Sequence, residues 1–188
     1  MRPSIKGSAF QSVIEDVRRL EGEGRLEAAD LDEALTEKDR GILDTVVTPV
    51  AWYPMETYAR LLELLVREEG GDDPVGYLCT RGARAAERLL AGAYGSFAAE
   101  PGTWGPRVGQ TMIGIGKLLY SFSTWGFRQV ADQVFEIEVN DAREFPDVAR
   151  YTAQGFVRWF AAAAAGRSMR VESTRPSPDR IVFRVEPL

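Results

Sequence analysis

The stretch that decides the fold is the last one, "GRSMRVESTRPSPDRIVFRVEP", which runs from Gly166 to Pro187. On each side of a proline-containing turn, the residues alternate between one face and the other, and the charged ones fall on the same face. A period of two is typical of a half-buried strand. The stretch therefore predicts a closing β-hairpin with one face in the core. The inward positions are Met169, Val171, Ser173, Ile181, Phe183 and Val185.

The segment before this hairpin predicts a helix preceded by a strand. Phe135, Ile137 and Val139 alternate with two glutamates, which indicates another half-buried strand. From Pro146 to Ala165 the apolar residues return to helical spacing, with bulky residues such as Trp159 as anchors, and Gly166 ends the helix.

The N-terminal part of the chain is predicted to be helical. A first helix is capped by Ser8 and ends at Gly22. Shorter helical turns follow over residues 25–47, where many acids form a solvated face between apolar anchors. Pro54 fits the first turn of a leucine-rich helix that Gly70 ends.

Two further helices carry small residues. One begins with Asp73 as its cap and Pro74 at its first position, and its narrow face of small residues allows another helix to approach closely. That face is made of Leu78, Gly82, Ala85, Ala86, Leu89 and Ala93. The other helix spans Val108 to Leu119 and contains several glycines. Its "IGIGKLL" lacks the residues of a phosphate-binding loop, so we expect a helix that passes close to another element or walls a cavity.

These patterns predict an α+β protein in a single domain over residues 1–188. A helix-rich N-terminal half packs on a small antiparallel sheet, and the C-terminal part of the chain forms most of that sheet. The length suits one domain that needs no disulfide or metal to fold.

The composition excludes several chemistries. The chain has no histidine, which removes Ser-His-Asp and Cys-His catalysis, histidine-held haem and most zinc sites. Cys79 is the only cysteine, and we expect it to act as a small apolar residue in a helix. We therefore expect no metal site, no cofactor and no catalytic residues.

Charge and hydropathy limit the partners and the location. The net charge is −5 and the arginines of the C-terminal part form no basic stripe, so a nucleic-acid partner is not expected. No apolar run approaches the roughly 20 residues of a membrane span, and the start of the chain lacks the pattern of a secretory signal. We expect a cytoplasmic protein.

Charged residues on the strands have a simple explanation. Glu136 and Glu138 share one face of a strand, where two carboxylates can act as acid and base, but this face is predicted to be the solvent face. Arg170, Arg180 and Arg184 lie on the outer face of the hairpin, where cross-strand ion pairs are expected.

Large aromatic residues cluster near the ends of the predicted elements. They either pack a core of ordinary size or line an apolar ligand cavity. The candidate cavity residues are Trp52, Tyr53, Tyr58, Trp104, Met112, Tyr120, Trp125 and Trp159.

Several short motifs together resemble a bacterial paralogous family of unknown function that is expanded in myxobacteria. They are Lys6-Gly7 with Phe10, Trp52-Tyr53-Pro54 before "LLELL", "YSFSTWG", and "MRVESTR" leading into "IVFRVEP". That family is similar to the ligand-binding domains of the 4-vinyl-reductase and haem-nitric-oxide-binding type, which share their fold with subunits of the Golgi transport particle. The resemblance implies helices packed on about four antiparallel strands, with a hydrophobic cavity between the layers.

The chain departs from that family in the closing hairpin. Several relatives carry cysteines there, whereas this chain has Thr174, Pro178 and Val182 in that region. The departure argues against metal binding and thiol-dependent sensing.

Two functions remain open. The first is a non-enzymatic sensory or regulatory module that binds a small hydrophobic molecule in a cavity between helices and sheet. The second is a protein-interaction subunit that forms a homodimer or binds another protein without a small-molecule ligand. An enclosed pocket lined by aromatic residues favours the first, and an exposed apolar patch on the helices that begin near Pro54 and Pro74 favours the second.

Overall fold

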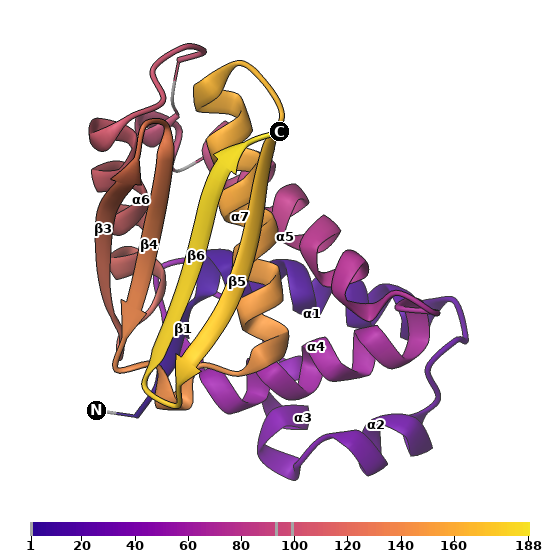
Figure 1. Ribbon diagram of the computed structural model, residues 1–188. Helices are drawn as coiled ribbons and strands as arrows, with labels where there is room; N and C mark the ends of the chain where they lie inside the picture. The colour runs from indigo at the N-terminus through magenta and orange to yellow at the C-terminus, as the bar shows by residue number, and fades with distance from the viewer. Residues whose placement is uncertain (1, 93, 99) are drawn as a thin grey trace.

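The structure is a computed structural model that describes residues 2–92, 94–98 and 100–188. It confirms the α+β class, with a helix-rich N-terminal part and an antiparallel sheet from the C-terminal part (Figure 1). The elements are β1 (Ser4–Lys6), α1 (Gly7–Gly22), α2 (Ala28–Ala34), α3 (Glu37–Leu43), β2 (Trp52–Pro54), α4 (Met55–Glu69), α5 (Pro74–Ala91), η1 (Gly95–Phe97), α6 (Pro106–Leu119), β3 (Thr124–Ala131), β4 (Val134–Asn140), η2 (Ala142–Glu144), α7 (Asp147–Ala165), β5 (Met169–Ser177) and β6 (Arg180–Pro187).

The main sheet has the strand order β3-β4-β6-β5, and all neighbouring strands are antiparallel. The predicted hairpin is β5–β6, with Val171 opposite Val185, and the predicted central strand is β4, with Ile137 opposite Phe183. The sequence did not predict β3. This edge strand buries only its first half, around Trp125, so it has no sustained alternation of apolar and polar residues.

The outer face of the sheet carries cross-strand ion pairs of Arg180 and Arg184, as predicted, whereas Arg170 pairs with Glu172 on its own strand. Arg180 lies 2.7 Å from Glu138, and Arg184 lies 3.8 Å from Glu136. Arg128 on β3 pairs with both glutamates. The two glutamates of β4 are thus partners of arginines on the neighbouring strands, as expected for a solvent face.

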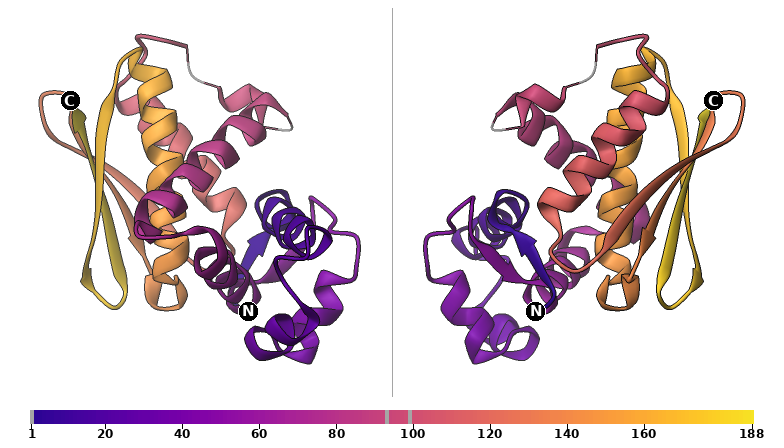
Figure 2. Two further views of the ribbon diagram at one scale, coloured as in Figure 1. Left: turned by 90° about the vertical axis from the view of Figure 1, so that its right-hand side faces the viewer. Right: turned by 90° about the vertical axis from the view of Figure 1, so that its left-hand side faces the viewer.

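The inner face of the sheet is covered by helices. Figure 2 shows α7 lying along the sheet, α5 on the far side of α7, and the N-terminal helices α1 to α4 farther from the sheet. The side of α7 that is most deeply buried consists of small residues and a few larger ones, including Ala149, Ala161 and Phe160. The large Trp159, which the sequence suggested as an anchor, is only half-buried, and so is Tyr151.

Two glycines permit the close crossing of α5 and α7. A Cβ atom added at Gly82 on α5 would lie 1.8 Å from the carbonyl oxygen of Thr152, and one at Gly155 on α7 would lie 1.9 Å from that of Cys79. Cys79 itself is buried and its Sγ lies 3.4 Å from the carbonyl oxygen of Tyr151. The predicted face of small residues on α5 therefore does receive another helix. Ala93, the last residue assigned to that face, lies outside the described residues.

The start of the chain forms a short two-stranded sheet that the sequence did not predict. Ile5 on β1 pairs with Tyr53 on β2, so Pro54 ends a strand and serves as the N-cap of α4 instead of lying in its first turn. Ser8 is not the N-cap of α1. The helix begins at Gly7 because the amides of residues 7 and 8 donate to carbonyls of the loop before β2, and the Ser8 hydroxyl lies 3.2 Å from that of Tyr94.

One acid of the segment 25–47 is buried, although the segment was predicted to present a solvated acidic face. Asp39 at the start of α3 is fully buried, and it accepts hydrogen bonds from the Arg60 guanidinium at 2.7 and 3.0 Å. It also accepts from the hydroxyls of Thr57 and Thr36. Burial alone would raise the pKa of Asp39, but these hydrogen bonds hold it well below its usual range. This carboxylate joins α3 to α4.

We expect Gly155→Ala to lower the free energy of unfolding by at least about 2 kcal/mol, because the new methyl group meets the backbone of α5. Urea unfolding measures the change. Gly114→Ala on α6 is the matched control, since its Cβ meets nothing within 4 Å. That control should raise stability by about 0.5 kcal/mol. Equal effects of the two substitutions would contradict the described crossing.

We expect Arg60→Met to cost about 3 kcal/mol in unfolding free energy, because it leaves a buried carboxylate without its cation. The exposed pair of Arg170 and Glu172 provides the control, and Arg170→Met should change stability little. Chemical denaturation of both variants at neutral pH checks the difference. A loss as small as that of the control would show that Asp39 does not depend on Arg60.

Candidate functional site

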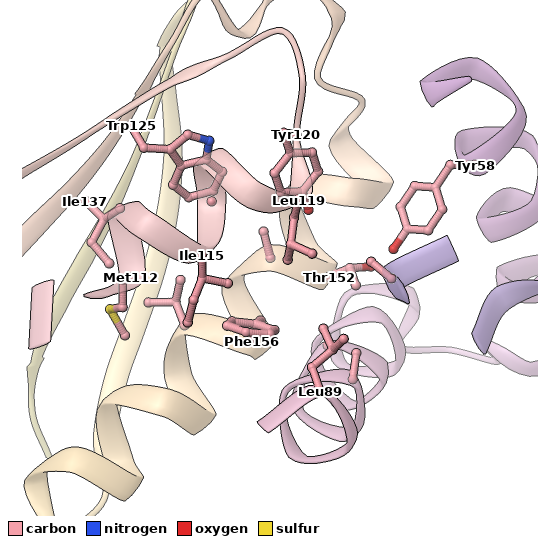
Figure 3. Close-up of a pocket in the computed structure, with 16 residues that line it drawn as sticks. Tyr58, Leu89, Met112, Ile115, Leu119, Tyr120, Trp125, Ile137, Thr152 and Phe156 are labelled. Atoms are coloured by element: carbon pink, nitrogen blue, oxygen red, sulfur yellow. The ribbon is translucent and has the colours of Figure 1, made fainter. Parts of the chain in front are cut away.

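An apolar cavity of about 50 Å³ lies among the helices and the inner face of the sheet (Figure 3). From α6 and the sheet, its lining includes Met112, Ile115, Leu119, Trp125 and Ile137. From α4, α5 and α7, its lining includes Tyr58, Leu89, Thr152 and Phe156. Among the residues that the structure describes, no charged one lines the cavity, so the cavity is suited to an uncharged occupant.

Glycine on α6 brings that helix close to the aromatic side chains of β3. A Cβ atom at Gly116 would lie 2.4 Å from the indole of Trp125, and one at Gly109 would lie 2.0 Å from the ring of Phe127. The helix therefore rests directly on these rings, and Gly116 is part of the cavity wall. This agrees with the prediction of a helix that passes close to another element or walls a cavity.

Tyr120 is fixed at the cavity by its backbone and by its ring. It follows α6, where its backbone forms a bridge with Ile5 of β1. Its ring stacks on Trp125 with centroids 5.6 Å apart and contacts Phe145 at 4.8 Å. Tyr58 enters from α4 on the opposite side, packed against Phe10 at 6.1 Å, and Figure 3 shows its hydroxyl directed toward Thr152.

The surroundings of both tyrosines favour the protonated phenol. Burial raises the pKa of Tyr58 to about 12, although the charge of Arg81 opposes the shift. Burial also raises the pKa of Tyr120 well above its usual range, and the neighbouring Tyr58 adds to the shift. Both side chains are therefore neutral hydrogen-bond donors at physiological pH.

The cavity adjoins a groove on the surface. The groove lies between α1 and α5 and includes Ser12 and Arg88. It shares Ala85 and Leu89 with the cavity, and both of these residues are partly exposed. These two residues therefore form the part of the cavity wall that borders the groove.

The structure brings together four of the eight candidate residues. Tyr58, Met112, Tyr120 and Trp125 line the cavity.

The other four candidates lie elsewhere. Trp52 is 44% exposed, with the Lys6 ammonium over its ring, and Tyr53 stacks on Phe10. Trp104 packs edge-on against Phe135, and Trp159 is half-buried on α7. Trp52, Tyr53 and Trp104 lie near the ends of elements, as predicted, whereas Trp159 lies within α7. None of the four lines the cavity.

The aromatic pattern missed the residues that make room for the cavity. Gly82, Ala85 and Gly116 leave space between the helices, and Thr152 and Phe156 close it from α7. The small residues on α5 and α6 were visible in the sequence. Only the three-dimensional crossing shows that they surround one space.

The described residues contain no cluster of three or more histidine, cysteine, aspartate or glutamate side chains that could hold a metal ion. Burial raises the pKa of the Cys79 thiol, which keeps it protonated and unreactive. Among these same residues, no helix is long and apolar enough to cross a membrane.

The fold is that of the H-NOX domains, which are similar to this chain over nearly its whole length. The Fe(II) unliganded H-NOX protein of K. algicida has 12% identity, covers 97% of this chain and 96% of its own, and gives a TM-score of 0.66. A mutant H-NOX of T. tengcongensis has 14% identity over 97% of each chain, with a TM-score of 0.62. A structure from work on haem redox potential and porphyrin distortion has 16% identity over 97% of this chain and 99% of its own, with a TM-score of 0.57.

No family model matches the sequence, and no curated protein matches it. The likeness to H-NOX structures at such low identity establishes the fold alone. The resemblance to the bacterial family of unknown function stays a prediction.

The residues at the site do not fit haem. The chain has no histidine to serve as an axial ligand, and Cys79 does not line the cavity. The two tyrosines there hold their protons, whereas a tyrosine that binds iron does so as the phenolate. The volume of about 50 Å³ is also far below that of a typical cofactor pocket, which is roughly 300–1,000 Å³.

We expect stability to fall as the pH rises above about 10. An exposed tyrosine in the unfolded chain has a pKa of about 10, whereas the pKa values of Tyr58 and Tyr77 are about 12 in the fold and that of Tyr120 is also raised. Between these pKa values the folded state binds more protons than the unfolded state. Each of these tyrosines therefore lowers the free energy of unfolding by about 1 kcal/mol at pH 11. Urea unfolding between pH 8 and pH 11 measures the loss.

A variant separates the contribution of the cavity residue Tyr58 to this loss of stability from the contributions of the other tyrosines. The variant Tyr58→Phe should show a shallower loss above pH 10 than the wild type, because one shifted group is gone. An identical slope would mean that Tyr58 titrates like an exposed tyrosine.

Proposed function

We propose that this protein is a non-enzymatic sensory module that binds a small, largely apolar molecule in the cavity between the helices and the sheet. The observation that carries the proposal is an uncharged cavity that borders a surface groove and lies where α4, α5, α6, α7, β3 and β4 meet. The H-NOX-like fold adds support by analogy. One fold hosts many functions, so the cavity itself carries the argument.

The position of the cavity suits a sensor. Its wall includes Ala9 and Tyr58 from the N-terminal helices and Met112 and Trp125 from α6 and the sheet. An occupant therefore contacts elements from both halves of the chain. A ligand shifts a conformational equilibrium by its difference in affinity for the two states, and a site shared by several elements is where such a difference arises.

The alternative function, a dimerising interaction subunit, has less support. The sequence suggested that an exposed apolar patch on the helices beginning near Pro54 and Pro74 would favour it. Among the described residues of α4 and α5, Val75 is the one large apolar side chain that is exposed. The apolar side of α4 is instead buried in the core.

Xenon tests the cavity directly, because xenon enters dry apolar cavities. We expect saturable shifts of amide signals in ¹H–¹⁵N spectra under xenon pressure, confined to residues of α4, α5, α6, α7 and β3. Ala85→Leu should abolish these shifts by filling the cavity.

The control makes the same substitution elsewhere on the same helix. Ala91 lies at the exposed end of α5, so Ala91→Leu should leave the xenon shifts unchanged. The proposed function is rejected if the wild type shows no saturable shifts, or if both variants respond as the wild type does.

A further inference from the structure

Two tyrosine hydroxyls reach the cavity without a hydrogen-bond partner in the protein. Tyr58 is 4% exposed and Tyr120 is 8% exposed, and both line the cavity. Within residues 2–92, 94–98 and 100–188, no hydrogen bond joins either hydroxyl to another group, and no hydrogen bond contributes to the pKa of either.

Three half-buried tyrosines of the chain, Tyr53, Tyr77 and Tyr94, do have hydrogen-bond partners. The Tyr53 hydroxyl accepts from the amide of Thr48 at 2.8 Å, and the Tyr77 hydroxyl donates to Glu69 at 2.9 Å. Tyr58 and Tyr120 are more deeply buried than these three tyrosines, and yet their hydroxyls have no partner in the protein.

The rings hold the two hydroxyls in place. Tyr120 is held between Trp125 and Phe145, and its backbone is paired with β1. The remaining polar side chain of the cavity, Thr152, already donates its proton to the carbonyl of Val148 at 3.0 Å. The cavity thus presents two donors that have no acceptor.

We propose that the ligand is a small uncharged molecule with one hydrogen-bond-accepting oxygen, of which a short-chain ketone is the simplest example, and that Tyr58 and Tyr120 donate to that oxygen. This inference rests on the proposed function and names the ligand class for the same site. The apolar part of the molecule lies against Met112, Ile115 and Leu119.

Size and charge narrow the class further. A volume of about 50 Å³ holds only a few heavy atoms, since a cavity needs roughly 10–15 Å³ of such volume to hold one water molecule. No charged side chain lines the cavity, so a carboxylate or an amine would be buried without a partner at high cost. Acetone, with four heavy atoms and one carbonyl, meets both conditions.

The test compares acetone with isobutene, which has the same shape but a methylene group in place of the oxygen. Binding is measured by titration in ¹H–¹⁵N spectra of the full chain. We expect acetone to shift the amides around the cavity, and we expect Tyr58→Phe and Tyr120→Phe each to weaken its binding about fivefold to tenfold. Isobutene binding should be unchanged or tighter in the same variants.

A matched variant controls for the loss of a tyrosine hydroxyl in general. Tyr151 lies on α7 and is half-buried, but it does not line the cavity. Tyr151→Phe should leave acetone binding as in the wild type. Thermal unfolding of all three variants shows whether each is folded before titration.

The outcomes separate this inference from the proposed function. If isobutene and xenon bind and acetone does not, or if the two tyrosine variants bind acetone as the wild type does, the ligand class is wrong and the apolar site remains. If none of the three probes binds, the proposed function fails as well.

Discussion

The structure depends on the contact between α5 and α7, where two helix backbones meet with no side chain between them. Gly82 and Gly155 make this approach feasible, since a methyl group at either position would enter the backbone of the other helix. The contact holds α5 against the sheet layer by way of α7. Away from the crossing point the two helices diverge, and the cavity lies beside it, with Gly82, Thr152 and Phe156 in its wall.

Sequence reasoning succeeded where a pattern is repeated along one element. The alternation in β4, β5 and β6 and the leucines of α4 each depend on one buried face, which local spacing records. It failed for β1 and β2, which are three residues long, and for β3, which is buried over only part of its length. Asp39 was missed because its partners, Thr57 and Arg60, belong to a different helix.

The candidate site shows the same division. Tyr58, Tyr120 and Trp125 were proposed because large aromatic side chains line cavities, and Met112 was named with them. The same argument could not separate them from Trp52 or Trp159, because a large side chain fills space wherever the fold places it. A cavity is space that no side chain fills. Where such space remains depends on which glycines and alanines face one another in the fold.

The pairing of β1 with the residues after α6 has a consequence for protein engineering. Three hydrogen bonds join Ser4 to Ser121, and the backbone of the adjacent Tyr120 pairs with Ile5. Arg2 is also tied to Glu56 on α4. An affinity tag or fluorescent fusion attached near residue 4 would therefore strain the wall of the cavity. The opposite end, where Leu188 is 82% exposed beyond β6, is the better attachment point for reporters of ligand binding.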